Sequence, residues 1–142
     1  MNRLIIYFSL ALIVSSCTSV KPVLQPTYNK GGYTFQKYHS KSLATEESVV
    51  IVGSITDLVK NNNLGSSSIK YECTTQQSSS GEFSLKGKAS AIKFQLIANS
   101  VGYLKVETEP FHTQPGDSIV VNFRLAQDEK PILYCEANPT GK

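Results

Sequence analysis

The sequence predicts an all-β sandwich that follows an N-terminal targeting segment. Two observations support this fold class. First, apolar and polar residues alternate over short stretches rich in β-branched and aromatic side chains, and turn-forming residues separate these stretches about every 8 to 12 residues. Second, beyond the first 17 residues no stretch carries an apolar stripe at the 3.6-residue period of a helix. Six or seven short strands are therefore expected.

The composition bounds the class of protein. The chain has 142 residues, of which 18% are charged, with a net charge of +3, three cysteines and no tryptophan. This length suits one domain of ordinary size. The low charge excludes a highly charged disordered tail, and a thinly spread +3 is not the footprint of a nucleic-acid-binding protein. We therefore expect no nucleic-acid partner.

The first 16 residues have the features of a signal peptide. Met1-Asn2-Arg3 gives a short basic start, and residues 4–14 form an apolar run broken only by Ser9. A helix of that length reaches about 16 Å, against about 30 Å for the hydrocarbon core of a bilayer. The run is thus too short to span a membrane and fits the apolar region of a signal peptide.

The residues that close this run, Val14-Ser15-Ser16-Cys17, resemble the lipobox of bacterial lipoproteins. The resemblance implies cleavage before Cys17 and lipidation of Cys17, so that membrane lipid is one partner. Thr18 rather than Asp after the cysteine favours the outer membrane, and the absence of acidic residues over 18–21 favours its periplasmic leaflet. The alternatives are an ordinary secretory signal with an incidental cysteine, or a buried N-terminal helix.

The other two cysteines leave two interpretations open. In an oxidising compartment, Cys73 and Cys135 form a disulfide that closes a loop of roughly 60 residues, or they remain two buried thiols. The histidines, His39 and His112, lie far apart and show no zinc-ligand spacing with the cysteines. No metal or cofactor is expected.

Residues 17–46 are expected to form the lipidated N-terminus and a tether, because they contain prolines and glycines and show no sustained period. Three tyrosines in this segment, Tyr28, Tyr33 and Tyr38, are candidate contact aromatics for a partner. The alternative for part of the segment is a short extra strand over residues 33–38.

Residues 47–127 carry the β pattern. A continuous β-branched run over 49–56 predicts a buried strand, and the later strands alternate apolar and polar residues, which predicts one wet face. The expected strands are 49–56, 68–74, 83–85, 91–98, 104–109 and 119–125, with loops or turns at 57–67, 76–81, 99–102 and 114–117. Residues 128–142 are expected to be a C-terminal tail with an edge strand over 132–136.

Short motifs follow one another in a defined order within this region: Gly53-Ser54-Ile55-Thr56-Asp57, Leu64-Gly65-Ser66, Ser80-Gly81-Glu82-Phe83-Ser84-Leu85, residues 94–98 leading into Val101-Gly102-Tyr103, and Gly116-Asp117-Ser118-Ile119. Together they resemble the carboxypeptidase regulatory-like domain that is common in Bacteroidetes lipoproteins and in front of TonB-dependent transporters. The resemblance covers residues 47–127. It implies a seven-stranded Greek-key sandwich of the transthyretin (prealbumin) type and a noncatalytic role.

Four glycines are expected to determine turns: Gly65, Gly81, Gly102 and Gly116. Tyr103 is expected to pack its ring while its hydroxyl group finds a backbone partner. Gln77-Ser78 stands where the family usually has Thr-Asp, so a calcium-binding or hydrogen-bonding role of that Asp is not carried over.

No set of residues predicts catalysis. His112, Asp117 and Ser118 lie close in sequence, but no Gly-x-Ser-x-Gly elbow accompanies them. We therefore expect a noncatalytic, membrane-anchored module that binds or scaffolds another protein of the cell envelope. The alternative is a lipoprotein that binds a glycan or small ligand through its exposed aromatic residues.

Overall fold

The structure is a computed structural model that describes residues 22–26, 31–40 and 47–130. These residues form nine β-strands, and none of them lies in a helix that could cross a membrane. The strands are β1 (Gln25–Pro26), β2 (Gly31–His39), β3 (Ser48–Asp57), β4 (Ser67–Tyr71), β5 (Thr74–Ser78), β6 (Glu82–Lys88), β7 (Leu96–Ser100), β8 (Val106–Glu107) and β9 (Asp117–Leu125).

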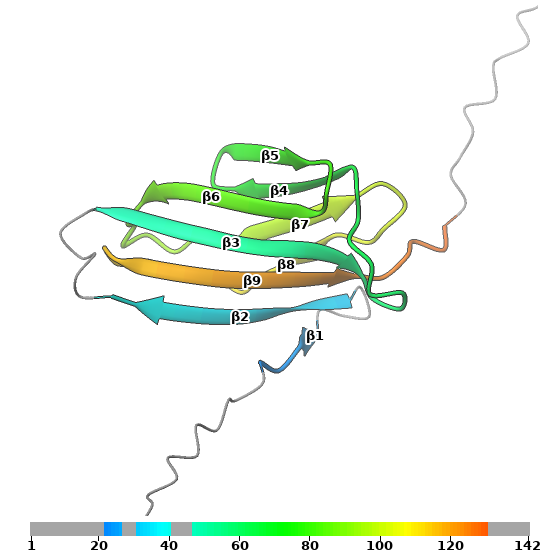
Figure 1. Cartoon of the computed structure of the whole chain (residues 1–142), viewed down its shortest axis with the longest axis horizontal. Helices are drawn as coiled ribbons and strands as arrows, with labels where there is room; N and C mark the ends of the chain where they lie inside the picture. Colours follow the sequence, from blue (N-terminus) through cyan, green and yellow to red (C-terminus); the bar gives the residue numbers. More distant parts are fainter. Residues whose placement is uncertain (1–21, 27–30, 41–46, 131–142) are drawn as a thin grey trace, which may run out of the picture.

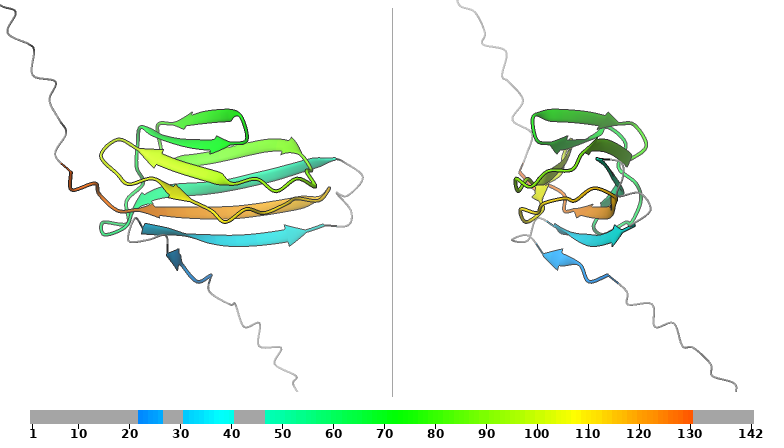
Figure 2. Two further views of the ribbon diagram at one scale, coloured as in Figure 1. Left: turned by 180° about the vertical axis from the view of Figure 1, so that it is seen from behind. Right: turned by 90° about the vertical axis from the view of Figure 1, so that its left-hand side faces the viewer.

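The strands form two sheets that pack face to face (Figures 1 and 2). Sheet A has the order β1-β2-β9-β3-β6, and sheet B has the order β5-β4-β7-β8. Neighbouring strands are antiparallel except β3 and β9, which run parallel at the centre of sheet A. The all-β, two-sheet class predicted from the sequence is confirmed. The seven-stranded Greek-key arrangement is not, since the described residues form nine strands.

The core lies between the sheets and is built by alternation along each strand. In β9 every second residue is fully buried, and the ring of Phe123 lies between Tyr33 and Phe83, with centroids 6.1 and 6.2 Å away. At one end the core is extended by an aromatic row, in which Phe94 contacts both Tyr71 and Phe111. Strict alternation in β9 is what a strand with one buried face requires.

Part of the expected tether belongs to the sheet. β2 pairs with β9 along all nine of its residues, from Gly31 opposite Leu125 to His39 opposite Asp117. The alternative of an extra strand over residues 33–38 is therefore the one the structure shows, and sheet A includes residues ahead of 47. The physical reason is that Tyr33 and Phe35 face the core and supply apolar area that a tether would leave in water.

Two other elements differ from expectation. Residues 74–78, expected to include the start of a turn, form β5, and the chain reverses instead at Glu72 and Cys73, where Glu72 has a φ of 51°. The strand expected over 91–98 is shorter in the structure. It is β7, which begins only at Leu96, and Ile92 lies in the loop before it with its side chain 80% exposed.

Candidate functional site

The outer face of sheet A carries a patch of apolar side chains. Strand register places residues of β2, β9, β3 and β6 in rows across this face. One row is Tyr38, Ser118, Val50 and Lys86, and the next is Gln36, Val120, Val52 and Ser84. We call Val50, Val52 and Val120 the valine strip. Directly opposite and diagonal residues on one face of a sheet are in contact range, so Tyr38 borders this strip.

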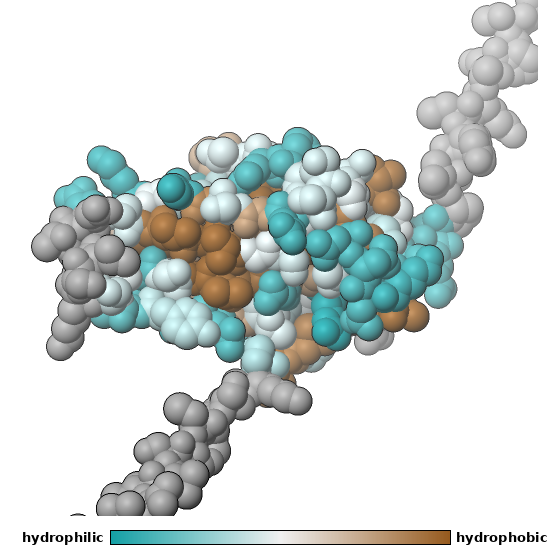
Figure 3. Space-filling view, in the orientation of Figure 1, coloured by the Kyte–Doolittle hydropathy of each residue, from teal (hydrophilic) through white to brown (hydrophobic). Residues whose placement is uncertain are grey.

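The valine strip is partly exposed. Its three valines are of intermediate burial, and Tyr38 is 55% exposed. Figure 3 shows a hydrophobic area over the left half of β3 and β9 on the face toward the viewer. The outer face of sheet B is different, because register places only Ile97 there among polar residues such as Lys70 and Asn99. The described residues therefore present one outer face with apolar character.

The continuous β-branched run over 49–56 was expected to form a buried strand. In β3 only alternate residues, including Val49 and Ile51, are buried, whereas Val50 and Val52 face outward. Among the described residues no element packs over this side of sheet A, so the outward valines keep contact with solvent. Exposed neighbouring valines are a common feature of interaction surfaces.

The face becomes polar toward the other end of the strands. Ser54 donates a hydrogen bond from Oγ to Asn122 Oδ1 at 3.0 Å, and Thr56 Oγ1 donates to the carbonyl oxygen of Phe123 at 3.0 Å. These hydroxyl and amide groups are held next to the valine strip. The face can therefore bind an apolar group and a hydrogen-bonding group side by side, but it holds no nucleophile beside a base.

A buried carboxylate fixes the backbone beneath Tyr38. Asp117, whose side chain is fully buried, accepts hydrogen bonds from Lys37 Nζ at 2.8 Å, from His39 Nδ1 at 3.1 Å and from the N–H of Gln114 at 2.6 Å. Lys37 and His39 flank Tyr38 and point to the opposite face of the strand. Asp117 thereby anchors both neighbours of Tyr38 and leaves the tyrosine on the outer face.

The environment of Asp117 favours its charged form. Burial raises the pKa of this carboxyl group, but the hydrogen bonds that it accepts and the nearby lysine lower it by more, so the pKa lies below its ordinary value. The cluster is a structural ion network, since its remaining hydrogen bond runs from Lys37 Nζ to the carbonyl oxygen of His112.

The three candidate contact tyrosines have different outcomes. Tyr33 is only 3% exposed, and its hydroxyl oxygen accepts a hydrogen bond from the N–H of Glu109 at 3.0 Å, so it is a core residue and not a contact residue. Tyr28 lies outside the described residues. Tyr38 is exposed on the outer face of sheet A and stays a candidate. The alternation of β2 explains the difference, because positions 33 and 38 differ by an odd number.

Two of the three cysteines lie outside the described residues. Cys17, the predicted lipidation site, and Cys135 are both outside them, whereas Cys73 is exposed in the turn between β4 and β5. The lipid anchor and the disulfide between Cys73 and Cys135 therefore stay predictions.

The turn glycines are mostly placed as expected. Gly81, Gly102 and Gly116 have φ angles of 77°, 80° and 82°, which favour glycine. Gly65 was expected to make the same kind of turn, but the positive φ of 54° belongs to Ser66. A side chain at Gly65 would instead come within 3.0 Å of the carbonyl oxygen of Ser79, so close approach to that strand end explains its glycine.

A second buried carboxylate, which sequence reasoning did not single out, lies at the opposite end of β3. Asp57 Oδ1 accepts hydrogen bonds from the N–H groups of Val59 and Lys60, and Oδ2 accepts one from the hydroxyl group of Tyr103 at 2.9 Å. Tyr103 was expected to bond to the backbone; it bonds to this side chain instead. The one sequence signal for this role was an Asp directly after a β run, since Asp side chains often accept hydrogen bonds from backbone N–H groups of the turn that follows.

This network shifts two pKa values in opposite directions. The hydrogen bond from the N–H of Lys60 is the largest influence on the pKa of Asp57 and lowers it, and although burial raises it, the net pKa is below its ordinary value. The pKa of Tyr103 is raised, chiefly because its hydroxyl group donates to Asp57. Both shifts favour the hydrogen bond as it stands.

The structure does not assemble the residues that were considered for catalysis. Ser118 lies on the outer face of sheet A, whereas the adjacent Asp117 points inward, and His112 is exposed. Within residues 22–26, 31–40 and 47–130, no three His, Cys, Asp or Glu side chains group as metal ligands would.

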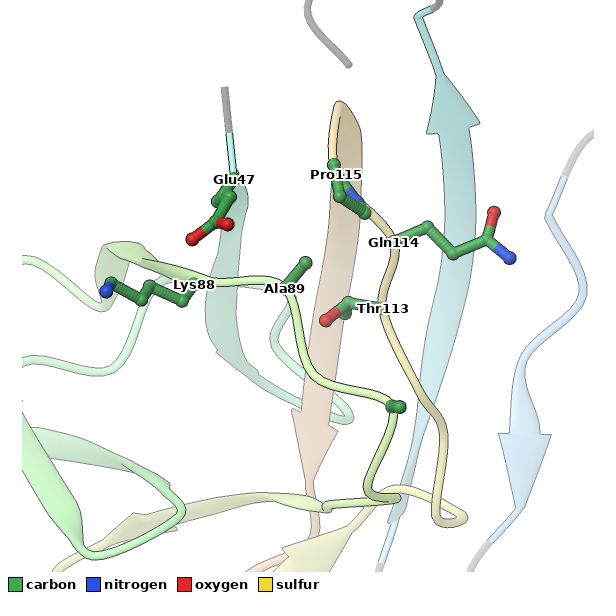
Figure 4. A pocket seen from close by; sticks show the side chains of 7 residues that line it. Glu47, Lys88, Ala89, Thr113, Gln114 and Pro115 are labelled. Carbon is green, nitrogen blue, oxygen red and sulfur yellow. The ribbon is translucent and has the colours of Figure 1, made fainter. Parts of the chain in front are cut away.

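A shallow hollow of about 410 Å³ lies at the end of the sandwich where β3 begins (Figure 4). Its lining residues are Glu47, Lys88, Ala89, Ala91, Thr113, Gln114 and Pro115. Thr113 Oγ1 accepts a hydrogen bond from the N–H of Ser90 at 2.9 Å, so this hydroxyl group fastens the wall of the hollow.

The residues thus define a two-sheet β domain with one partly apolar outer face. The chain matches no protein-family model and no curated protein. Among solved structures it is similar to a candidate membrane-associated protein of unknown function from Bacteroides fragilis, with 22% identity and a TM-score of 0.47 over 60% of this chain and 30% of the other. It is also similar to a candidate carbohydrate-binding protein from Bacteroides uniformis, with 19% identity and a TM-score of 0.40 over 54% of this chain and 40% of the other.

The chain therefore spans less than half the length of both solved structures. The identities and TM-scores are too low to carry a function from either protein to this one. The resemblance to carboxypeptidase regulatory-like domains is not confirmed by a family match and stays a prediction.

Proposed function

We propose that this chain is a noncatalytic lipoprotein, anchored in the periplasmic leaflet of the outer membrane through Cys17, whose β-sandwich binds or scaffolds another protein of the cell envelope. The observation that carries the binding role is the outer face of sheet A, where the valine strip and Tyr38 lie together. A partly apolar face with an aromatic residue at its border has the chemistry that protein interfaces favour.

Site-specific photo-crosslinking in cells tests the binding role. A photoreactive residue in place of Tyr38 or Ser84 should give the same discrete crosslinked product, because both positions lie on the outer face of sheet A. The matched control is Lys70, an exposed position on the outer face of sheet B, which should give none. A Val52→Glu change, which places a charge in the middle of the valine strip, should abolish the product at Tyr38.

Crosslinks of equal strength from both faces, or a product at Tyr38 that survives Val52→Glu, would contradict this assignment. Thermal unfolding of Val52→Glu serves as the control for folding, since Val52 is partly exposed and a modest change in Tm is expected.

One observation favours a second candidate, the binding of a glycan. The exposed ring of Tyr38 lies beside the Gln36 amide, and a stacking ring next to hydrogen-bonding side chains is suited to a sugar. Binding on a glycan array that is lost in Tyr38→Ala, with Val52→Glu still active, would support this candidate over a protein partner.

A further inference from the structure

One end of the sandwich carries two exposed valines at the tips of neighbouring loops. Val59 lies in the loop after β3 and is 83% exposed, and Val101 lies in the turn after β7 and is 80% exposed. Both follow strands that run in the same direction along the molecule, and Figure 1 shows both loops at its right-hand end. We call these two residues and their loops the valine end.

The Asp57 network holds these two loops together. The carboxylate of Asp57 accepts the N–H of Val59 at 2.7 Å through one oxygen and the hydroxyl group of Tyr103 at 2.9 Å through the other. The turn around Val101 is closed by a hydrogen bond from the N–H of Tyr103 to the carbonyl oxygen of Ser100. The exposed valines are therefore presented by ordered backbone, which lowers the entropy lost when they bind a surface.

The N-terminal part of the chain joins the fold at this same end. β1 pairs with Gly32 and Tyr33, the second and third residues of β2. The first residue of β2, Gly31, lies opposite Leu125, which in turn lies beside Asp57. Cys17 precedes Gln25 by eight residues, which extend at most about 28 Å. A lipid on Cys17 would keep the bilayer within this reach of Gln25, whose strand joins sheet A at the end that carries the valine end.

We propose that the valine end lies against the phospholipid surface, with the side chains of Val59 and Val101 inserted at the level where headgroups meet acyl chains. This inference rests on the lipid anchor of the proposed function. Lys60, next to Val59, can reach the phosphate groups with its ammonium group. Asp128, whose N–H donates to Gly102 at 2.9 Å, places a carboxylate at the same end, so apolar contact and not charge is the main attraction.

The opposite end offers a matched comparison. Ile92 is 80% exposed in the loop between β6 and β7, as exposed as Val101. That loop follows Lys88, which pairs with the first residue of β3, so Ile92 is separated from the valine end by the length of the strands. If exposure of a single aliphatic residue were enough for lipid contact, Ile92 would behave like Val59.

The chain has no tryptophan, so one introduced tryptophan is the only tryptophan and can be excited selectively at the long-wavelength edge, where the tyrosines hardly absorb. The full lipidated chain is prepared as Val59→Trp, Val101→Trp and the control Ile92→Trp, and each is bound to vesicles of phosphatidylethanolamine and phosphatidylglycerol that contain brominated acyl chains. We expect a blue-shifted emission and severalfold stronger bromine quenching for Val59→Trp and Val101→Trp than for Ile92→Trp.

Three results would overturn the proposal, and they differ from one another. Equal quenching at all three positions means that the domain has no fixed orientation. Protein that sediments with the vesicles but shows no quenching at Val59→Trp or Val101→Trp means that the tether holds the valine end away from lipid. Protein that does not sediment, with an N-terminal peptide of unlipidated mass, overturns the anchor of the proposed function and the orientation with it.

Discussion

At the scale of single residues, two buried carboxylates fasten the two ends of sheet A. Asp117 ties β2 to the start of β9, and Asp57 ties the end of β3 to the turn at Tyr103. Each is almost fully buried and accepts hydrogen bonds from main-chain N–H groups as well as from side chains. Both oxygens of each carboxylate accept hydrogen bonds inside the fold, and a buried ionised group needs such partners to remain charged.

These carboxylates predict a loss of stability in acid. The pKa values of Asp57 and Asp117 in the folded chain lie below the ordinary value of 3.8, so the unfolded chain binds protons first as the pH falls. Their stabilisation is fully present above that ordinary value and is lost as the pH drops through the folded pKa. Urea unfolding at a series of pH values from neutral down to strong acid should show a decreasing free energy of unfolding below about pH 4.

Single substitutions separate the contribution of Asp117 to acid stability from that of the other carboxyl groups. Lys37→Met removes one charged hydrogen-bond donor that is about a third exposed, and we expect it to lower the free energy of unfolding at neutral pH by about 1 kcal/mol. Asp117→Asn should lower stability at neutral pH and make the acid slope shallower. An acid slope that is the same in Asp117→Asn as in the parent chain would show that Asp117 is not one of the groups responsible.

At the scale of elements, β3 is held on both sides, because it pairs in parallel with β9 on one side and antiparallel with β6 on the other. Gly53 lies in the middle of this strand. A Cβ atom there would collide with the carbonyl oxygen of Val121 and come within 2.8 Å of the ring of Phe83. Neither neighbour can retreat without breaking a strand pair or moving a core ring.

We therefore expect alanine substitutions at Gly53 and Gly102 to lower the free energy of unfolding by different amounts. Gly53→Ala should lower the free energy of unfolding by about 1–3 kcal/mol or prevent folding, since it overpacks a central strand. At Gly102 the backbone φ is 80°, and no atom lies within 4 Å of the Cβ that an alanine would add. For Gly102→Ala we therefore expect only the conformational cost of this φ, about 1–2 kcal/mol in the free energy of unfolding. Chemical unfolding of both variants measures the difference, and a Gly102→Ala variant less stable than Gly53→Ala would contradict the packing account.

The elements also show how far the sequence leads. β9 could be predicted because every second residue from Ile119 is apolar and a turn at Gly116 precedes the strand. In the structure each of these apolar residues is fully buried. β5 could not, because its residues are polar and mostly exposed, as turn residues are. The parallel pairing of β3 with β9 joins residues nearly 70 positions apart, and no local pattern encodes it.

The candidate site was predictable only in part for a related reason. Tyr38 could be named from the sequence, but Val50 and Val52 look the same in a continuous β-branched run as their buried neighbours. Which face of β3 is covered depends on the second sheet, and this is decided by long-range packing. The Asp57 network was missed since its partners come from three separate loops.

At the scale of the whole molecule, part of the segment that follows the proposed lipid anchor belongs to sheet A. β1 and β2 add two strands to the edge of sheet A at residues that the sequence assigns to a tether. This leaves a shorter stretch between Cys17 and the folded domain than a full tether would provide. The domain is then expected to lie close to the membrane surface and not far out in the periplasm.

The anchor itself gives the last prediction. Cys17→Ser retains the apolar run over 4–14 but removes the thiol that would be acylated, so the lipid-modified N-terminal peptide should disappear and the protein should no longer fractionate with the outer membrane. Cys73→Ser is the matched control and should stay with the membrane, because Cys73 is exposed in the sandwich and away from the signal. Cell fractionation and the mass of the N-terminal peptide give the readout. A Cys17→Ser chain that still fractionates with the outer membrane would contradict the assignment of Cys17 as the anchor.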